Sequence, residues 1–322
     1  MRNNFIKIFL LILVFVFIAI VAWEINSRRT GKGSVNPWEY NVDEFREIED
    51  SSVIKYSEIL NIKLDSANHR GIAYSDNRIY IVGDDFLQVI SPDGKELLHK
   101  NLSGSPKCLT VQGESIFIAY PSKIESYDLK GELVHSWVIK GDSSLITSLK
   151  VFEGLLFAAD AGNRRVLRYS IDGEFLGQFE GKSETGQLHG FIIPSACFDL
   201  DTSTDGELWV VNPGKHALEH YSHEGRMIRF WESFSFSIDG FSGCCNPVHI
   251  AILPDGSFVT SEKGIVRIKV HKPYGELYGI VASPAKFKNA IYAPDLAVSP
   301  EGLIFALDFN TNLVRVFESL NN

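Results

Sequence analysis

The stretch "DAGNRRVLRYSIDGEFLGQF", residues 160–179, carries the pattern that decides the fold. It predicts a loop, a strand, a tight turn and a second strand. Gly173 follows Tyr169 by four residues, as expected where a tight turn between antiparallel strands needs a positive φ. The same offset recurs in Ile90–Gly94, Tyr127–Gly131, Tyr221–Gly225 and His271–Gly275. The chain is therefore predicted to repeat one hairpin unit.

A second repeated element lies upstream of each turn: a short apolar strand, a small or polar turn, and another strand. Its six copies begin at Gly71, Cys108, Ser148, Cys197, His249 and Asp295. The turn glycines are 37, 42, 52 and 50 residues apart. Units of roughly 40–50 residues with four short strands are typical of β-propeller blades. No sustained helical periodicity follows residue 52, which argues against a coiled coil or an α/β fold.

The last unit lacks its outer strand, because the turn glycine expected four residues after Phe317 would fall at position 321 and the chain ends at 322. A propeller with an open seam would expose strand edges. The segment "KYSEILNIKL", residues 55–64, precedes the first inner strand and can supply the missing outer strand. The expected fold is all-β, a six-bladed β-propeller over residues 53–322, closed by an N-terminal strand.

The charge of the chain is unevenly distributed. The 322 residues carry a net charge of −9, with 45% apolar residues, as in a folded protein. The first 32 residues hold five basic groups and one acid, a net +4, so the remainder carries −13. Nucleic-acid binding needs a basic surface, so an acidic body of this kind argues against a nucleic-acid partner.

The N-terminal segment is apolar. Ile8 to Trp23 contains no charged residue, and Phe5 extends the run past Lys7. Residues 1–24 are predicted to be one transmembrane helix that contacts the membrane through residues 5–23, with a cleaved signal peptide as the alternative. Residues 25–52 are predicted to be an acidic linker. Either interpretation places the propeller on the extracytoplasmic side, where disulfides are permitted.

Residues 160–169 resemble the NHL repeat, a propeller repeat written roughly Asp-x-x-Asn-x-Arg-Val-x-x-aromatic. Asp160, Asn163, Arg165, Val166 and Tyr169 match it. Two other units keep the spacing in part, with Asp308, Val314 and Phe317 in one and Asn212, Leu218 and Tyr221 in the other. The resemblance covers about residues 55–318. It implies architecture more than activity, since such propellers include scaffolds, receptors, lyases and lactonases. It also implies that Asp160 and Arg165 join neighbouring strands.

Ligand sites of propellers gather around the central channel, where the links between blades meet the turns between second and third strands. The segment "FSGCCNPVHI", residues 241–250, lies in one such link, and its Gly and Asn-Pro indicate a turn. Three interpretations of Cys244 and Cys245 stay open. They form a vicinal disulfide, they bind a metal or cofactor with His249, or they are two small packed residues. A structural zinc site is not expected, because no Cys-x-x-Cys pair accompanies them.

Other candidate residues surround this link. Asn246 and His249 follow the cysteines, and Glu262 and Lys263 are expected in the adjacent turn on the same rim, as a ligand-binding or solvated pair. His69 and Arg70 enter the first blade on that rim. Together with Arg164, Lys215 and His216 they would form a partly basic pocket that favours an anionic ligand.

Catalysis is less expected than binding. Propeller-type amidating lyases bind zinc through channel histidines, whereas here only His249 occupies such a position and Cys108 and Cys197 fill two others. The predicted function is a non-catalytic, extracytoplasmic module that binds a protein or a small polar or anionic ligand on the blade-link rim. The alternative is a redox or metal-dependent enzyme, lyase-like, lactonase-like or an electron-transfer accessory, that uses Cys244 and Cys245 or a channel metal. The cofactor stays unassigned.

Overall fold

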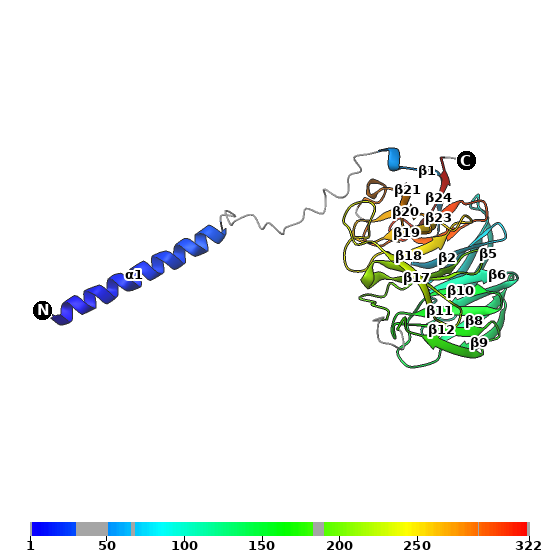
Figure 1. The fold of residues 1–322 in the computed structure, drawn as a ribbon, viewed down its shortest axis with the longest axis horizontal. Coiled ribbons are helices and arrows are strands. Elements are labelled where there is room, and N and C mark those ends of the chain that lie inside the picture. The colour runs from blue at the N-terminus through cyan, green and yellow to red at the C-terminus, as the bar shows by residue number, and fades with distance from the viewer. Residues whose placement is uncertain (1, 30–50, 66–67, 183–189, 289, 321–322) are drawn as a thin grey trace. The chain divides into compact units, whose positions relative to one another are not determined.

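The computed structural model describes residues 2–29, 51–65, 68–182, 190–288 and 290–320 (Figure 1). The chain divides into two compact units, Met1–Val42 and Asp43–Asn322. Helix α1 (Arg2–Arg29) belongs to the first unit. By length and hydropathy, no helix among the described residues qualifies as a membrane span, so the predicted transmembrane helix is not confirmed. Most of the predicted acidic linker, residues 30–50, lies outside the described residues.

The second unit consists of six four-stranded antiparallel sheets, the predicted blades. Blade one holds β2 (His69–Ser75), β3 (Arg78–Gly83), β4 (Phe86–Ile90) and β5 (Glu96–Asn101). Blade two holds β6 (Cys108–Gln112), β7 (Ser115–Ala119), β8 (Lys123–Asp128) and β9 (Leu133–Val138). Blade three holds β10 (Ile146–Phe152), β11 (Leu155–Asp160), β12 (Arg165–Ser170) and β13 (Phe175–Phe179).

The remaining blades follow the same order. Blade four holds β14 (Leu200–Thr202), β15 (Leu208–Asn212), β16 (Ala217–Tyr221) and β17 (Met227–Glu232). Blade five holds β18 (His249–Ile252), β19 (Phe258–Glu262), β20 (Arg267–His271) and β21 (Leu277–Ala282). Blade six holds β22 (Asp295–Val298), β23 (Ile304–Asp308), β24 (Leu313–Ser319) and β1 (Tyr56–Lys63). Three short 3-10 helices are η2 (Ser51–Val53), η3 (Pro213–Lys215) and η4 (Pro284–Lys286).

The predicted closure of the propeller is confirmed. Strand β1 pairs antiparallel with β24 from Tyr56 opposite Ser319 to Lys63 opposite Leu313, and Figure 1 shows the two strands side by side. An ion pair reinforces the seam, with Arg315 Nε 2.8 Å from Glu58 Oε1. The N-terminal strand thus covers the edge that β24 would otherwise present to solvent.

Burial follows the position of each strand in its blade. Every residue of β15, β16, β19 and β20 is buried, because blades cover both faces of the middle strands. Outer strands such as β17 alternate between half-buried and exposed residues. The core lies between neighbouring blades, as where Phe157 of blade three packs in one cluster with Val210 of blade four. This explains why second strands such as β11 and β15 are nearly continuous apolar runs.

The turn glycines adopt the predicted conformation. Gly94, Gly131, Gly173, Gly225 and Gly275 have φ between +77° and +94°. The amide of Gly225 donates to the carbonyl of Ser222 at 2.9 Å, which closes a tight turn. A Cβ atom on Gly225 would lie 2.4 Å from Phe179 Cβ, so the space also requires glycine there.

The inner strand of blade four differs from the prediction. Strand β14 begins at Leu200 and not at Cys197. His249 and Ser148 each pair with the residue just before the last residue of the next strand, Ser261 and Ala159. The equivalent residue in blade four is Asp199, whose carbonyl accepts a hydrogen bond from the amide of Val211. The assignment of Cys197 to this position was wrong by two residues, because the link before β14 contains a similar apolar pattern.

Candidate binding site in the central channel

The first residues of the inner strands form a layer at the blade-link end of the channel. Aligned by their pairing partners, the six blades contribute Gly71, Cys108, Ser148, Asp199, His249 and Asp295. The only three charged groups of this layer lie in consecutive blades, four to six. The channel is therefore polar on one side at this depth and nearly apolar on the other.

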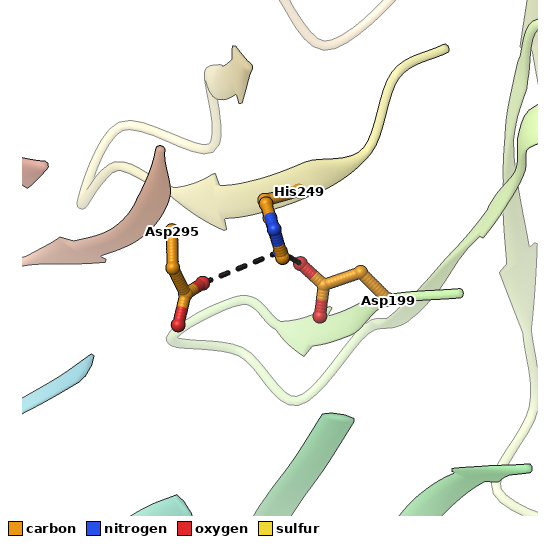
Figure 2. Close-up of side chains that lie close together, drawn as sticks. All are labelled: Asp199, His249 and Asp295. Carbon is orange, nitrogen blue, oxygen red and sulfur yellow. Dashed lines mark ion pairs between the residues drawn. The ribbon is translucent and has the colours of Figure 1, made fainter. Parts of the chain in front are cut away.

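His249 lies between two carboxylates, as Figure 2 shows. Its Nδ1 is 3.4 Å from Asp199 Oδ2 and 3.3 Å from Asp295 Oδ1. The three side chains are only 22%, 10% and 18% exposed for His249, Asp199 and Asp295. One ligand atom from each residue lies within 4.8 Å of the others, so the three have the spacing of a metal-binding group.

Electrostatics favour the charged imidazole. Burial alone would lower the pKa of His249, but Asp295 and Asp199 outweigh it and raise the pKa to about 9. The pKa of Asp295 is raised by burial and by the nearby Asp199 carboxylate, with His249 opposing both. At neutral pH the site therefore holds an imidazolium ion, which a metal ion must deprotonate before it can bind Nδ1.

The same carboxylates also join the blades. Asp199 Oδ2 accepts a hydrogen bond from the amide of Ile250 at 2.9 Å, and Asp295 Oδ2 accepts one from the amide of Ile72 at 3.0 Å. Each bond links one inner strand to the next blade. The orientation of the carboxylates is thus set by the backbone, and the cluster is preorganised around His249.

A cavity of about 580 Å³ occupies the channel. All six inner strands line it, from the layer of Cys108, Asp199 and Asp295 to the turns that follow those strands. One layer further along, Lys150 Nζ lies 2.5 Å from Asp201 Oδ1, and Asp201 Oδ2 accepts from the amide of Ile252 at 2.9 Å. The cavity has the size of a small-molecule site, and its lining carboxylates outnumber its cations.

The cysteine loop lies where the sequence predicts, in a turn between blades four and five. Cys244 is exposed and Cys245 is buried, both are free thiols, and their Sγ atoms are 2.9 Å apart. Of the three interpretations left open by the sequence, the vicinal disulfide is therefore not confirmed. Asn246 is 2% exposed and anchors the loop, because its Nδ2 donates to the carbonyl of Ser242 at 2.6 Å and its Oδ1 accepts from the amide of Lys263 at 2.9 Å.

Glu262 and Lys263 do not form a pair on the rim. The Glu262 side chain is fully buried and contacts Arg267 Nε at 2.7 Å and Lys269 Nζ at 2.9 Å. Lys263 turns the other way, with Nζ 2.8 Å from Ser195 Oγ and 3.5 Å from Cys197 Sγ. The prediction of Glu262 as a ligand-binding or solvated residue was wrong, because alternate residues at a strand end point in opposite directions.

Four of the five residues expected in the basic pocket have a lowered pKa or lie beside a carboxylate. Arg70 Nε donates to Asp84 Oδ1 at 2.7 Å. His69 is buried against Phe86, and burial lowers its pKa, so it is neutral at pH 7. Burial also lowers the pKa of His216, and Lys215 lies 3.5 Å from Glu219. No described contact joins His69 or Arg70 to the cysteine loop.

Asp160 and Arg165 join strands, as the repeat resemblance implied. Asp160 accepts from Arg165 Nε at 2.9 Å and from the amide of Leu145 at 2.9 Å. Cys108 is buried at the channel wall, where burial and the nearby carboxylates raise the pKa of its thiol well above the ordinary value.

Sequence reasoning missed Asp199, Asp201 and Lys150. Asn212 is the last residue of β15, as Glu262 is of β19. His249 precedes Glu262 by 13 residues, and the same distance before Asn212 leads to Asp199.

No family model matches the chain, and no curated protein matches it. Solved structures do match. A streptogramin B lyase structure shares 12% identity with a TM-score of 0.57, over 84% of this chain and all of that chain. A catalytically inactive histidine-to-alanine variant of virginiamycin B lyase from Staphylococcus aureus, with quinupristin, shares 15% identity with a TM-score of 0.59, over 83% of this chain and all of that chain.

A propeller of another kind is equally similar. The WD40 β-propeller domain of Doa1 shares 14% identity with a TM-score of 0.56, over 82% of this chain and 97% of that chain. Identities at this level show the fold alone, and membership of the NHL family stays a prediction. The neighbours and the six sheets together establish that residues 56–319 of this chain form a six-bladed β-propeller.

Proposed function

We propose that the protein is a non-catalytic binding module that holds a small ligand in the central channel of its propeller. The observation that carries this proposal is the cavity of about 580 Å³, lined by the inner strands of all six blades. Such a volume is typical of sites for small molecules. The hydrogen bonds from Asp199 and Asp295 to neighbouring blades support a rigid, preformed site.

The charge of the lining favours a ligand with cationic or hydrogen-bond-donating groups. Asp199, Asp201 and Asp295 line the cavity. Lys150 pairs with Asp201, and the adjacent His249 imidazolium lies between the other two carboxylates, so the three carboxylates outnumber these two cations. A carboxylate accepts hydrogen bonds and attracts cations, so an amine or a polyhydroxylated compound suits this cavity better than the anion expected from the rim residues. The rim remains a predicted contact for a protein partner.

Calorimetry and thermal shift with three probe sets test this proposal: polyamines, neutral sugars and dicarboxylic acids. We expect a polyamine or a sugar to bind with one site per chain and a dicarboxylic acid not to bind. Asp201→Asn should weaken binding at least tenfold, whereas Asp172→Asn, in an exposed turn of blade three, should leave it unchanged. Equal binding by both variants, or binding of the dicarboxylic acids alone, would contradict a channel site.

A second candidate function is metal-dependent or acid–base catalysis at Asp199, His249 and Asp295. The observation in its favour is the spacing of the three side chains, and the lyase structures show that propellers of similar fold include enzymes. Two carboxylates and an imidazole suit Mn²⁺ or Zn²⁺. Because the metal displaces the His249 proton, binding of Mn²⁺ measured by calorimetry should tighten between pH 7 and pH 9, and His249→Gln should abolish it.

The location of the protein is part of the proposal. The uncharged run Ile8–Trp23, preceded by Arg2 and Lys7, supports membrane attachment through residues 5–23 with the propeller on the extracytoplasmic side. Carbonate extraction of membranes, followed by protease treatment of intact cells or spheroplasts, tests it. Recovery of the full chain in the soluble cytoplasmic fraction would contradict it.

A further inference from the structure

The cysteine loop holds two thiols in contact on a fixed scaffold. Cys244 Sγ and Cys245 Sγ are 2.9 Å apart, while a disulfide bond is about 2.05 Å long. Asn246 fastens the loop to the turn after β19 through hydrogen bonds with the carbonyl and the amide of Lys263. The cysteine loop and the backbone of Lys263 therefore keep a defined arrangement.

The two thiols have different surroundings. Cys244 is exposed, whereas Cys245 is 3% exposed. Burial would raise the pKa of the Cys245 thiol, but the contact with Cys244, the nearby Ser195 hydroxyl and the Lys263 charge outweigh burial and lower it. The pKa of Cys244 is raised, chiefly by its hydrogen bond with Cys245. Within the described part of the chain, no carboxylate lies within the 4 Å of an ion pair from Lys263 Nζ, so its charge is available to a thiolate.

We propose that Cys244 and Cys245, whose sulfur atoms are in contact, form a thiol–disulfide exchange site, in which exposed Cys244 exchanges with a low-molecular-weight thiol or disulfide and buried Cys245 is the internal thiol, with Lys263 as the nearby cation. This site is separate from the channel cavity, whose lining includes neither cysteine. The proposal therefore does not depend on the ligand-binding function proposed above.

The exchange balances with one external disulfide, RSSR. The Cys244 thiolate attacks one sulfur of RSSR, which forms a Cys244–SR bond and releases RS⁻. The Cys245 thiolate then attacks Cys244 Sγ, which forms the Cys244–Cys245 disulfide and releases the second RS⁻. Two electrons pass from the cysteines to RSSR, and the two protons that the cysteines lose convert both RS⁻ ions to RSH. The reverse reaction reduces the loop, with Cys245 as the leaving thiolate.

Lys263 and Ser195 explain why the two cysteines have different roles, with Cys245 as the leaving thiolate and Cys244 as the exchanging thiol. A leaving thiolate departs faster when its pKa is low, and an external molecule reaches only the exposed sulfur. Cys197 is the competing thiol, because its Sγ lies 3.3 Å from Ser195 Oγ and 3.5 Å from Lys263 Nζ. Among the described contacts, Cys244 Sγ pairs with Cys245 Sγ and not with Cys197 Sγ.

The test uses the full chain, reduced and then exposed to oxidised glutathione, with acid quenching, alkylation and peptide mapping by mass spectrometry. We expect a Cys244–Cys245 disulfide in the native chain and a glutathione adduct on Cys244 in Cys245→Ser. Cys244→Ser should form at least tenfold less adduct. A Cys197–Cys245 disulfide, an adduct mainly on Cys245, or free cysteines throughout would overturn the proposal.

A second measurement tests the role of Lys263. In Lys263→Met, the rate of disulfide closure at pH 7 should fall about threefold for each unit by which the pKa of Cys245 rises, because the smaller thiolate fraction is partly offset by a more nucleophilic thiolate, and its pH midpoint should move upward. Lys272→Met, in the exposed turn after β20, is the matched control and should close at the native rate. Equal rates and midpoints in Lys263→Met and Lys272→Met would show that Lys263 has no role in the site. The adduct mapping in Cys245→Ser tests the exchange site even if Lys263→Met does not fold.

Discussion

Raising the pH from 6.5 to 9.5 should remove the proton that His249 shares with Asp199 and Asp295 and so destabilise the propeller. The pKa of His249 is raised from 6.5 to about 9 in the folded chain. A group with a raised folded pKa contributes its full stability below the unfolded pKa of 6.5 and loses it as the pH rises through about 9. At 1.36 kcal/mol per pKa unit, the loss is about 3 kcal/mol.

The assay is urea unfolding of the native chain and of His249→Gln at half-unit steps from pH 6 to pH 9.5. The difference in free energy of unfolding between the two proteins should shrink by about 3 kcal/mol over this range. Groups common to both chains, such as Lys269 with its pKa near 8, cancel in the difference. Histidine NMR spectra of the native chain should show one imidazole that stays protonated past pH 8 and is missing in the variant.

A constant difference between the two chains across this range would refute the reasoning. So would a histidine spectrum in which every imidazole titrates below pH 7. Either result would mean that the carboxylates do not both face His249 in their charged forms, and the layer of charges at the blade-link end of the channel would need another arrangement.

Three further predictions concern stability. Glu262→Gln should lower the free energy of unfolding by about 3–5 kcal/mol in urea titrations, because it leaves Arg267 and Lys269 buried without their counter-charge. The control Asp172→Asn, at an exposed residue, should change the free energy of unfolding by less than about 0.5 kcal/mol. Gly225→Ala, at φ +94° against Phe179, should lower the melting temperature more than Gly113→Ala, which has φ +56° and open space. Deletion of residues 51–63 unpairs β24, so light scattering should show self-association, and a monodisperse monomer would contradict this role of β1.

Much of the architecture could be predicted because it depends on local chemistry. A turn glycine such as Gly173 needs positive φ whatever surrounds it, and the apolar runs of the middle strands follow from packing between blades. The closing strand could be inferred because the sequence contains six inner strands but only five complete turns, and an unpaired strand edge is unfavourable in any propeller. Cys244 and Cys245 were predicted in a turn for the same local reason, from the neighbouring Gly243 and the Asn246–Pro247 pair.

The candidate site was predicted only in part, because its residues belong to different blades. The sequence identifies His249 by its position but assigns Cys197 where the structure has Asp199. Strand β14 has only three residues, and residues 197 and 199 would face the same side of an extended segment, so the pattern does not distinguish them. The sequence predicts residues 261–264 as a turn on the rim, whereas Glu262 is the last, buried residue of β19. The repeat itself argues otherwise: Glu262 holds the position of Asp160, which is buried with Arg165.

Residue order along the chain was thus enough to specify strands, turns and the number of blades, because each of these depends on neighbours within a few residues. Which groups share the channel was decided by the closure of the ring. Asp199, His249 and Asp295 come together across 97 residues of sequence because six blades return each inner strand to one axis. The burial that raises the pKa of Asp295 and the contacts that lower that of Cys245 exist only after this closure, since electrostatic shifts require desolvation and proximity that no local segment supplies.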